Sequence, residues 1–145
     1  MNTEESASLV SRYMTAHLNG DYETVSELLS DELSHNFSRS GITVDMATKQ
    51  DAVRMAKSAG PVDIKFHDMI ASGDKVVVRY SYTISSDAVA GAIPGTTAEV
   101  TGIAIVRVEN GKIREIWQEQ DVLAMLLAFG MRLLPAKNQS WDRRS

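Results

Sequence analysis

The chain has 145 residues, of which 43% are hydrophobic and 23% are charged, and these proportions are ordinary for one globular domain. Its net charge of -4 gives no basic surface of the kind that binds nucleic acid. The sequence contains no cysteine, which excludes disulfides, thiolate metal sites and thiol nucleophiles. We therefore expect a single domain at residues 1–135, followed by a polar tail at residues 136–145.

The sequence predicts no signal peptide and no membrane-spanning segment. The first six residues are acidic and lack the basic-then-apolar order of a signal peptide. The longest apolar run, residues 122–129, is too short to cross a bilayer. These features indicate a cytoplasmic protein that binds neither a membrane nor nucleic acid.

The first 60 residues carry helical patterns. In residues 4–18, four side chains at helical spacing, including Tyr13 and His17, share one face. A second helix begins after Asp21, whose carboxylate can cap it. Residues 31–44 are mixed and polar, which predicts a turn or short helix followed by an irregular stretch. Thr48 begins a capping box for a third helix.

After these helical patterns, the spacing of the hydrophobic residues changes from a period of 3.6 residues to a period of 2. A period of 2 is typical of half-buried strands. Helices followed by a series of strands and a terminal helix predict an α+β fold, with the helices on one face of an antiparallel sheet. The expected strands are residues 62–67, 75–84, 97–108 and 112–120, and a terminal helix is expected after Asp121.

Asp121 is the first candidate for chemistry, because it lies between the last strand and a run in which nine of thirteen residues are large and apolar. Partial desolvation raises the pKa of a carboxyl group and makes it a better proton acceptor near neutral pH. The alternative is that Asp121 only caps the next helix, and the residues alone favour this alternative.

The three histidines are too scattered to predict a metal site, since no HxH or HExxH pattern occurs. His17 lies on the apolar face of the first helix, where a structural role is favoured, and His67 should point away from the core. His35 follows the second helix, where the chain would enter a cavity under the sheet, and it suits a functional and a structural role equally. The sequence has no glycine-rich phosphate loop, so we expect no nucleotide cofactor.

Two aromatic residues are candidates for contact with a ligand. The Tyr13 hydroxyl needs a hydrogen-bond partner, which is either a backbone group or a ligand carbonyl. Trp117 has the same parity as Asp121 along the last strand, so both face one cavity if no bulge intervenes.

The order of these elements resembles the SnoaL-like polyketide cyclases, which share a cone-shaped α+β fold with ketosteroid isomerase, scytalone dehydratase and the nuclear transport factor. The resemblance covers roughly residues 5–135. It rests on three segments, which are Asn19-Gly20-Asp21, residues 70–79 (IASGDKVVVR) and residues 111–117 (GKIREIW) followed by Asp121 and Gly130.

This resemblance implies a ring closure by intramolecular aldol condensation, without cofactor or metal. By position, Asp121 matches the acid/base aspartate of the family, His35 a histidine after the second helix, and Trp117 the aromatic residue before the acid. The chain departs from the family at Tyr82–Ser85, where many relatives have Gly-Thr-His, so a histidine from that region is missing.

Tyr13 also falls where ketosteroid isomerase has its oxyanion tyrosine. The catalytic base of that enzyme would fall near His35 and Asn36, where this sequence has no acid.

The sequence therefore predicts an enzyme that acts on a small apolar carbonyl compound in a deep pocket. Asp121 would remove an α-proton, and His35 or Tyr13 would donate a hydrogen bond to the enolate oxygen. Trp117 and Asn36 would contact the substrate. Two alternatives are a protein that binds a hydrophobic ligand without catalysis, and a dehydratase or isomerase that uses the same acid. We also expect a homodimer that forms through the outer face of the sheet.

Overall fold

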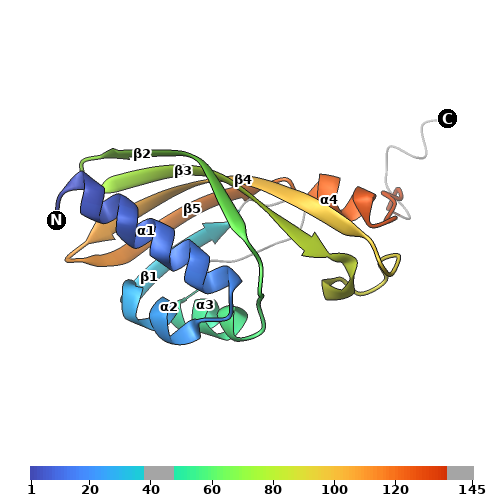
Figure 1. The fold of residues 1–145 in the computed structure, drawn as a ribbon, viewed down its shortest axis with the longest axis horizontal. Helices are drawn as coiled ribbons and strands as arrows, with labels where there is room; N and C mark the ends of the chain where they lie inside the picture. Colours follow the sequence, from blue (N-terminus) through green and yellow to red (C-terminus); the bar gives the residue numbers. More distant parts are fainter. Residues whose placement is uncertain (38–47, 137–145) are drawn as a thin grey trace.

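The computed structural model describes residues 1–37 and 48–136. The described residues form an α+β fold in which three helices pack against a curved sheet, as Figure 1 shows. The helices are α1 (Thr3–Leu18), α2 (Tyr22–Leu28), α3 (Lys49–Lys57), the 3-10 helix η1 (Ser86–Ala88) and α4 (Val122–Ala128). The strands are β1 (Leu29–Phe37), β2 (Ile64–Ser72), β3 (Lys75–Ser85), β4 (Thr97–Glu109) and β5 (Lys112–Gln120).

Side-chain caps explain where the first three helices begin. The Asn2 side chain accepts a hydrogen bond from the Glu5 backbone N–H at 2.8 Å, and the Glu5 carboxylate accepts one from the Asn2 backbone N–H. Asp21 caps α2, and Thr48 forms the predicted capping box at the start of α3. The predicted helix positions are therefore confirmed.

The sheet has the strand order β1-β5-β4-β3-β2, with antiparallel pairing except between β1 and β5, which run parallel. The predicted α+β class is confirmed, but the sheet is mixed rather than wholly antiparallel. The prediction for residues 31–44 was wrong in its first half, because residues up to Phe37 belong to strand β1. Residues 38–44 of that prediction lie outside the described part of the chain.

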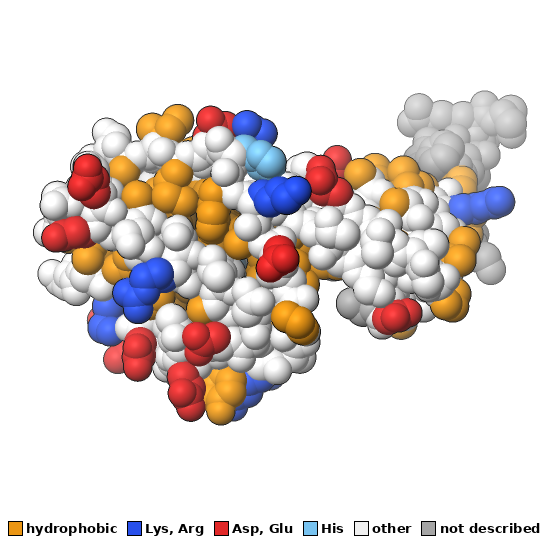
Figure 2. Space-filling model, viewed as in Figure 1, with side chains coloured by type: hydrophobic (Ala, Val, Ile, Leu, Met, Phe, Trp, Pro, Cys, Tyr) orange, Lys and Arg blue, Asp and Glu red, His pale blue; other side chains and the backbone are white. Residues whose placement is uncertain are grey.

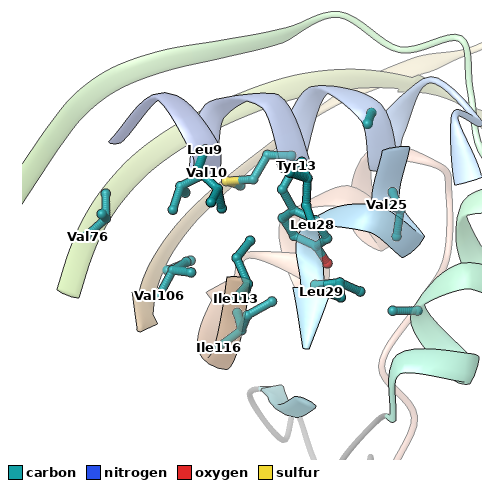
Figure 3. Close-up of a cluster of buried hydrophobic side chains, with 14 of the residues drawn as sticks. Leu9, Val10, Tyr13, Val25, Leu28, Leu29, Val76, Val106, Ile113 and Ile116 are labelled. Carbon is teal, nitrogen blue, oxygen red and sulfur yellow. The ribbon is translucent and has the colours of Figure 1, made fainter. Parts of the chain in front are cut away.

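The main core lies between α1 and the concave face of the sheet, as Figure 3 shows. Val10 and Val25, from α1 and α2, are fully buried against strand residues such as Val106 and Ile113. Burying a side chain of this size contributes roughly 1.5–3 kcal/mol each. The core thus fixes α1 across the sheet, and α1 then forms one wall of a cavity.

The predicted terminal helix is present beyond β5 as α4. It ends at Ala128 and packs beside β4. Together with the segment between β3 and β4, it forms a projection that narrows away from the main body, as Figures 1 and 2 show. Within the described residues, none of the helices has the length and apolar character needed to span a bilayer.

Candidate functional site

A cavity of about 150 Å³ lies between α1 and the concave face of the sheet. An engineered protein cavity of about this size holds a benzene molecule, so a ring-sized ligand fits such a space. Its described lining residues include no Asp, Glu, Lys or Arg. The apolar part of the wall consists of Met14, Leu18 and Met55 from the helices, and Ala104, Val106 and Ile116 from the sheet.

A chain of hydrogen bonds between uncharged side chains crosses the sheet side of this cavity. His35 Nε2 lies 2.8 Å from Gln118 Oε1, and Gln118 Nε2 donates to the Tyr80 hydroxyl. The Tyr80 and Tyr82 hydroxyls both donate to Gln120 Oε1, at 2.9 and 3.1 Å. With these amide orientations, His35 carries its proton on Nε2. We call these five residues the polar relay.

The titratable groups of the relay are neutral at neutral pH. Burial lowers the pKa of His35 to about 4; the hydrogen bond that His35 donates to Gln118 raises this pKa, and the nearby His17 lowers it further. Burial likewise raises the pKa of Tyr80 and of Tyr82 above the ordinary value for tyrosine. The relay therefore offers hydrogen bonds to a ligand but no charge.

Two further polar side chains reach the cavity from α1. Tyr13 and His17 are four residues apart, so they lie on one face of the helix, with ring centroids 5.9 Å apart. Figure 3 shows Tyr13 extending from α1 toward the sheet. Burial, and then the neighbouring Tyr80, raise the pKa of Tyr13, while burial lowers the pKa of His17.

His17 and Tyr13 also have unused hydrogen-bonding capacity. His17 Nδ1 is a buried atom without a hydrogen-bond partner among the residues that the structure describes. The Tyr13 hydroxyl makes no hydrogen bond with the described part of the chain, although it lines the cavity. The α1 wall thus presents the Tyr13 hydroxyl to the cavity as a donor, whereas His17 Nδ1 is enclosed.

Asp121 and Trp117 lie on the other face of the sheet. The Trp117 side chain is 54% exposed, and its indole N–H donates to Glu115. Asp121 is exposed in a shallow outer groove beside Glu119, where its carboxylate accepts a hydrogen bond from the Ala124 N–H at 3.0 Å and caps α4. The structure therefore brings Tyr13 and His35 together, and separates Asp121 from both.

A β-bulge in β5 explains this separation. Val108 pairs with Ile113 but the next pair is Arg107 with Glu115, so Arg114 is an extra residue. One extra residue reverses the side to which every later side chain points. The inner face of β5 after the bulge consequently carries Ile116, Gln118 and Gln120.

Asn36, predicted to contact the substrate, has a structural environment. Its side-chain amide donates to the Ser34 hydroxyl and to the Ile116 carbonyl, both at 3.2 Å. The bond to Ile116 connects β1 to β5 beside His35. Its contact with a substrate stays a prediction.

Four polar residues of the cavity were not predicted from the sequence, namely Gln118, Gln120, Tyr80 and Tyr82. The available signal was the alternation of Ile116, Gln118 and Gln120 along one strand, since polar side chains in step with an apolar one share its face. Tyr80 and Tyr82 show the same alternation on β3.

Solved structures share this fold over nearly the whole chain. IdmH of Streptomyces antibioticus, for which a polyketide cyclase activity is proposed, is 20% identical with a TM-score of 0.73, and the match covers 87% of this chain and 99% of IdmH. AclR of Streptomyces galilaeus, proposed to be a hydroxylase, is 18% identical with a TM-score of 0.75, over 94% of this chain and 91% of AclR.

An epoxide hydrolase of M. tuberculosis, described as LEH-like, is 22% identical with a TM-score of 0.66, over 88% of this chain and 90% of that one. These identities establish a shared fold and no more. A search of curated proteins found no significant match. The model of the SnoaL-like domain matches residues 10–116. The chain therefore belongs to the SnoaL-like domain family, as the sequence resemblance indicated.

Proposed function

We propose that this protein is an enzyme that moves a proton on a small, neutral carbonyl compound bound in the cavity, without a cofactor. The observation that carries the proposal is the pairing of an apolar cavity with uncharged donors, Tyr13 and the polar relay. An aldol-type ring closure, as in the proposal for IdmH, is one reaction that begins with such a proton transfer.

The absence of charge on the described lining residues limits the ligand. Burying an ionised group without a partner costs several kcal/mol, so a cavity of neutral groups favours a neutral ligand. The carbonyl oxygen of such a ligand is an acceptor, and the Tyr13 hydroxyl is a donor with no partner in the described chain. This match favours a carbonyl compound over a hydrocarbon.

The donors become more useful as the reaction proceeds. Removing an α-proton moves negative charge onto the carbonyl oxygen, and a hydrogen bond donated to that oxygen strengthens with the charge. Tyr13 stays protonated because its pKa is raised, so it can fill this role throughout the neutral range. His35 has a positioning role, because its single ring N–H donates to Gln118 Oε1 and so orients the Gln118 amide at the cavity.

The proton acceptor predicted from the sequence, Asp121, does not line this cavity. Its carboxylate lies in the outer groove, so the sheet would separate it from a carbonyl compound bound beside Tyr13. The proposed chemistry therefore needs an acceptor from among the cavity residues.

Exchange of α-protons for deuterium tests the proposal without knowledge of the natural substrate. Cyclohexanone is a neutral ring-sized ketone, and its exchange in D₂O can be followed by proton NMR. We expect the protein to accelerate this exchange. Tyr13→Phe should reduce the acceleration by roughly ten-fold or more, since removal of one such donor costs a few kcal/mol of transition-state stabilisation. Unaccelerated exchange with the wild-type protein would count against the enzyme.

Ligand binding without catalysis is the second candidate function, and the neutral, mostly apolar wall supports it as well. The two candidates differ in one result. Saturable binding of cyclohexanone, seen as shifts of cavity resonances, together with exchange at the uncatalysed rate, would identify a binding protein. Binding accompanied by accelerated exchange would identify the enzyme.

A further inference from the structure

We propose that the side-chain amide of Gln120 binds a second acceptor oxygen of the ligand, apart from the carbonyl oxygen that Tyr13 binds. This inference rests on the proposed function, because it takes the cavity as the site of the ligand. It makes Gln120 a residue that determines specificity, not one that moves a proton. The ligand class is then a neutral, ring-sized compound with acceptor oxygens at two separate positions.

The orientation of the Gln120 amide follows from the hydrogen bonds of the polar relay. Gln118 Nε2 donates to the Tyr80 hydroxyl, and that hydroxyl donates its own proton to Gln120 Oε1. The Tyr82 hydroxyl donates to the same oxygen at 3.1 Å. A carbonyl oxygen has two lone pairs, so both are occupied. The amide nitrogen is therefore the part of Gln120 that remains for a ligand.

The Gln120 amide nitrogen carries two unused donors at an accessible position. A primary amide has two N–H groups, and Gln120 Nε2 makes no hydrogen bond with any described residue. Among the described residues, His17 Nδ1 alone is a buried polar side-chain atom without a partner, so Gln120 Nε2 is not enclosed. An accessible donor beside an apolar wall favours a ligand that carries an acceptor.

The two tyrosine hydroxyls hold this amide on the concave face of the sheet. Tyr80 and Tyr82 are two residues apart on β3, so they share one face, and their rings stack with centroids 6.3 Å apart. Both line the cavity, as does Gln120. Gln120 also borders the outer groove, but an amide bonded to two hydroxyls of the concave face lies on the cavity side.

Tyr13 and Gln120 belong to opposite walls of the cavity. Tyr13 extends from α1 toward the sheet (Figure 3), and Gln120 belongs to β5, which forms part of the sheet wall. One ligand oxygen for each wall matches this arrangement better than a single oxygen shared by both. The two hydrogen bonds to Oε1 also polarise the Gln120 amide, which strengthens its N–H groups as donors.

A pair of matched ligands tests the inference. Cyclohexane-1,4-dione has a carbonyl at each end of its ring, and 4-methylenecyclohexanone has the same shape with a methylene group in place of one oxygen. We expect the wild-type protein to bind the dione roughly five-fold more tightly, the usual contribution of one neutral hydrogen bond. In Gln120→Met, which has a side chain of similar length without a donor, the two ligands should bind nearly equally.

The ratio between the two ligands separates a donor from a structural role. If Gln120→Met only disturbed the relay, it would weaken both ligands alike and leave the preference for the dione in place, which would overturn the inference. Equal binding of the two ligands by the wild-type protein would also overturn it. The matched control is Gln50→Met, at an exposed position of α3 that does not line the cavity, and it should keep the preference.

The side-chain amide resonances of Gln120 give a second measurement that needs no variant. In ¹⁵N-labelled wild-type protein they are assigned by their NOE contacts to the Tyr82 ring. We expect the dione to shift a Gln120 amide proton downfield, because a hydrogen bond to a carbonyl deshields it, and 4-methylenecyclohexanone to shift it less. An unshifted amide in protein saturated with the dione would overturn the inference.

The exchange of α-protons separates this inference from the proposed function. Accelerated exchange of cyclohexanone without a preference for the dione would reject the role of Gln120 and leave the enzyme standing. A preference that depends on Gln120, without accelerated exchange, would support the donor in a protein that binds its ligand without catalysis. A protein that neither binds these ketones nor accelerates exchange would reject both.

Discussion

Burial of the His35 imidazole couples the stability of the protein to pH. The side chain is 5% exposed, and its pKa of about 4 in the folded state lies below the ordinary value of 6.5. The unfolded chain therefore binds this proton first as the pH falls. The contribution of neutral His35 to stability is complete above pH 6.5, and it is lost as the pH falls from 6.5 toward 4.

We expect the free energy of unfolding to fall by about 3 kcal/mol between pH 7 and pH 4 from His35 alone, because one pKa unit corresponds to about 1.4 kcal/mol. His17, whose pKa is also lowered, acts in the same direction. Urea unfolding at several pH values would measure the fall, and His35→Gln should flatten the profile. Identical profiles for the two proteins would contradict the assignment.

The side chain of Asp121 caps α4, and this cap leads to a second prediction for a single residue. Asp121→Ala should lower the free energy of unfolding by about 1 kcal/mol, whereas Asp121→Asn should lower it much less, because Asn caps helices as well as Asp. Thermal unfolding of the three proteins would show this order. Equal losses in both variants would indicate that the carboxylate charge, not the cap, stabilises the fold.

At the scale of elements, the inner face of β4 carries small side chains where the cavity needs space. Gly102 pairs with Tyr80 on one side and with Gln120 on the other, in the middle of the sheet. A Cβ atom at this position would lie 2.5 Å from the Tyr80 hydroxyl oxygen and 3.0 Å from the Glu119 carbonyl oxygen. Because Gly102 has no side chain, the Tyr80 ring can extend across β4 to Gln118 and Gln120.

Gly102→Ala is therefore expected to displace the Tyr80 hydroxyl and to weaken its hydrogen bonds to Gln118 and Gln120. The NMR signals of the His35 ring would report the change, because Gln118 links that ring to Tyr80. In a Tyr80→Leu background the same substitution should have a much smaller effect on stability. Equal effects in both backgrounds would show that Tyr80 is not the group displaced.

The elements also show which features of the fold the sequence could reveal. Helix caps and alternating strands are local signals, and they located α1 to α3 and the antiparallel strands. Strand β1 is polar and pairs parallel with a strand that lies about 80 residues later, so no local pattern marked it. The bulge at Arg114 also has no local sequence pattern, because it is defined only by the pairing of β5 with β4.

The site was predicted only in part for this reason. Tyr13 and His35 were placed in a cavity under the sheet, and both line it. Trp117 and Asp121 were expected to face one cavity if no bulge intervened, and the bulge places them on the outer face. His17 had an apolar helical neighbourhood, which cannot distinguish a core histidine from one at the edge of a cavity.

At the scale of the whole molecule, the outer face of the sheet offers a surface for the self-association that the sequence predicted. Ile70, Val77, Ile105 and Trp117 pair in one row across four strands, and three of them are exposed. We call this row the outer stripe. Exposed apolar rows of this kind suit contacts between proteins.

The homodimer stays a prediction, and Ile105→Lys tests it at the centre of the stripe. Sedimentation should show a dimer for the wild-type protein and a monomer for this variant. Leu127→Lys, at an exposed position on α4, should remain dimeric and serves as the matched control. A wild-type protein that sediments as a monomer would contradict the predicted dimer.

The central claim is that the cavity between α1 and the sheet, not the outer groove at Asp121, holds the ligand. Chemical-shift mapping with cyclohexanone tests this claim most directly, because the two places share only Tyr80 and Gln120 among their lining residues. We predict that resonances of His17, His35 and Tyr82 shift in a saturable way while those of His67 and Asp121 do not. Shifts confined to His67, Asp121 and their neighbours would contradict the account and return the site to the outer face.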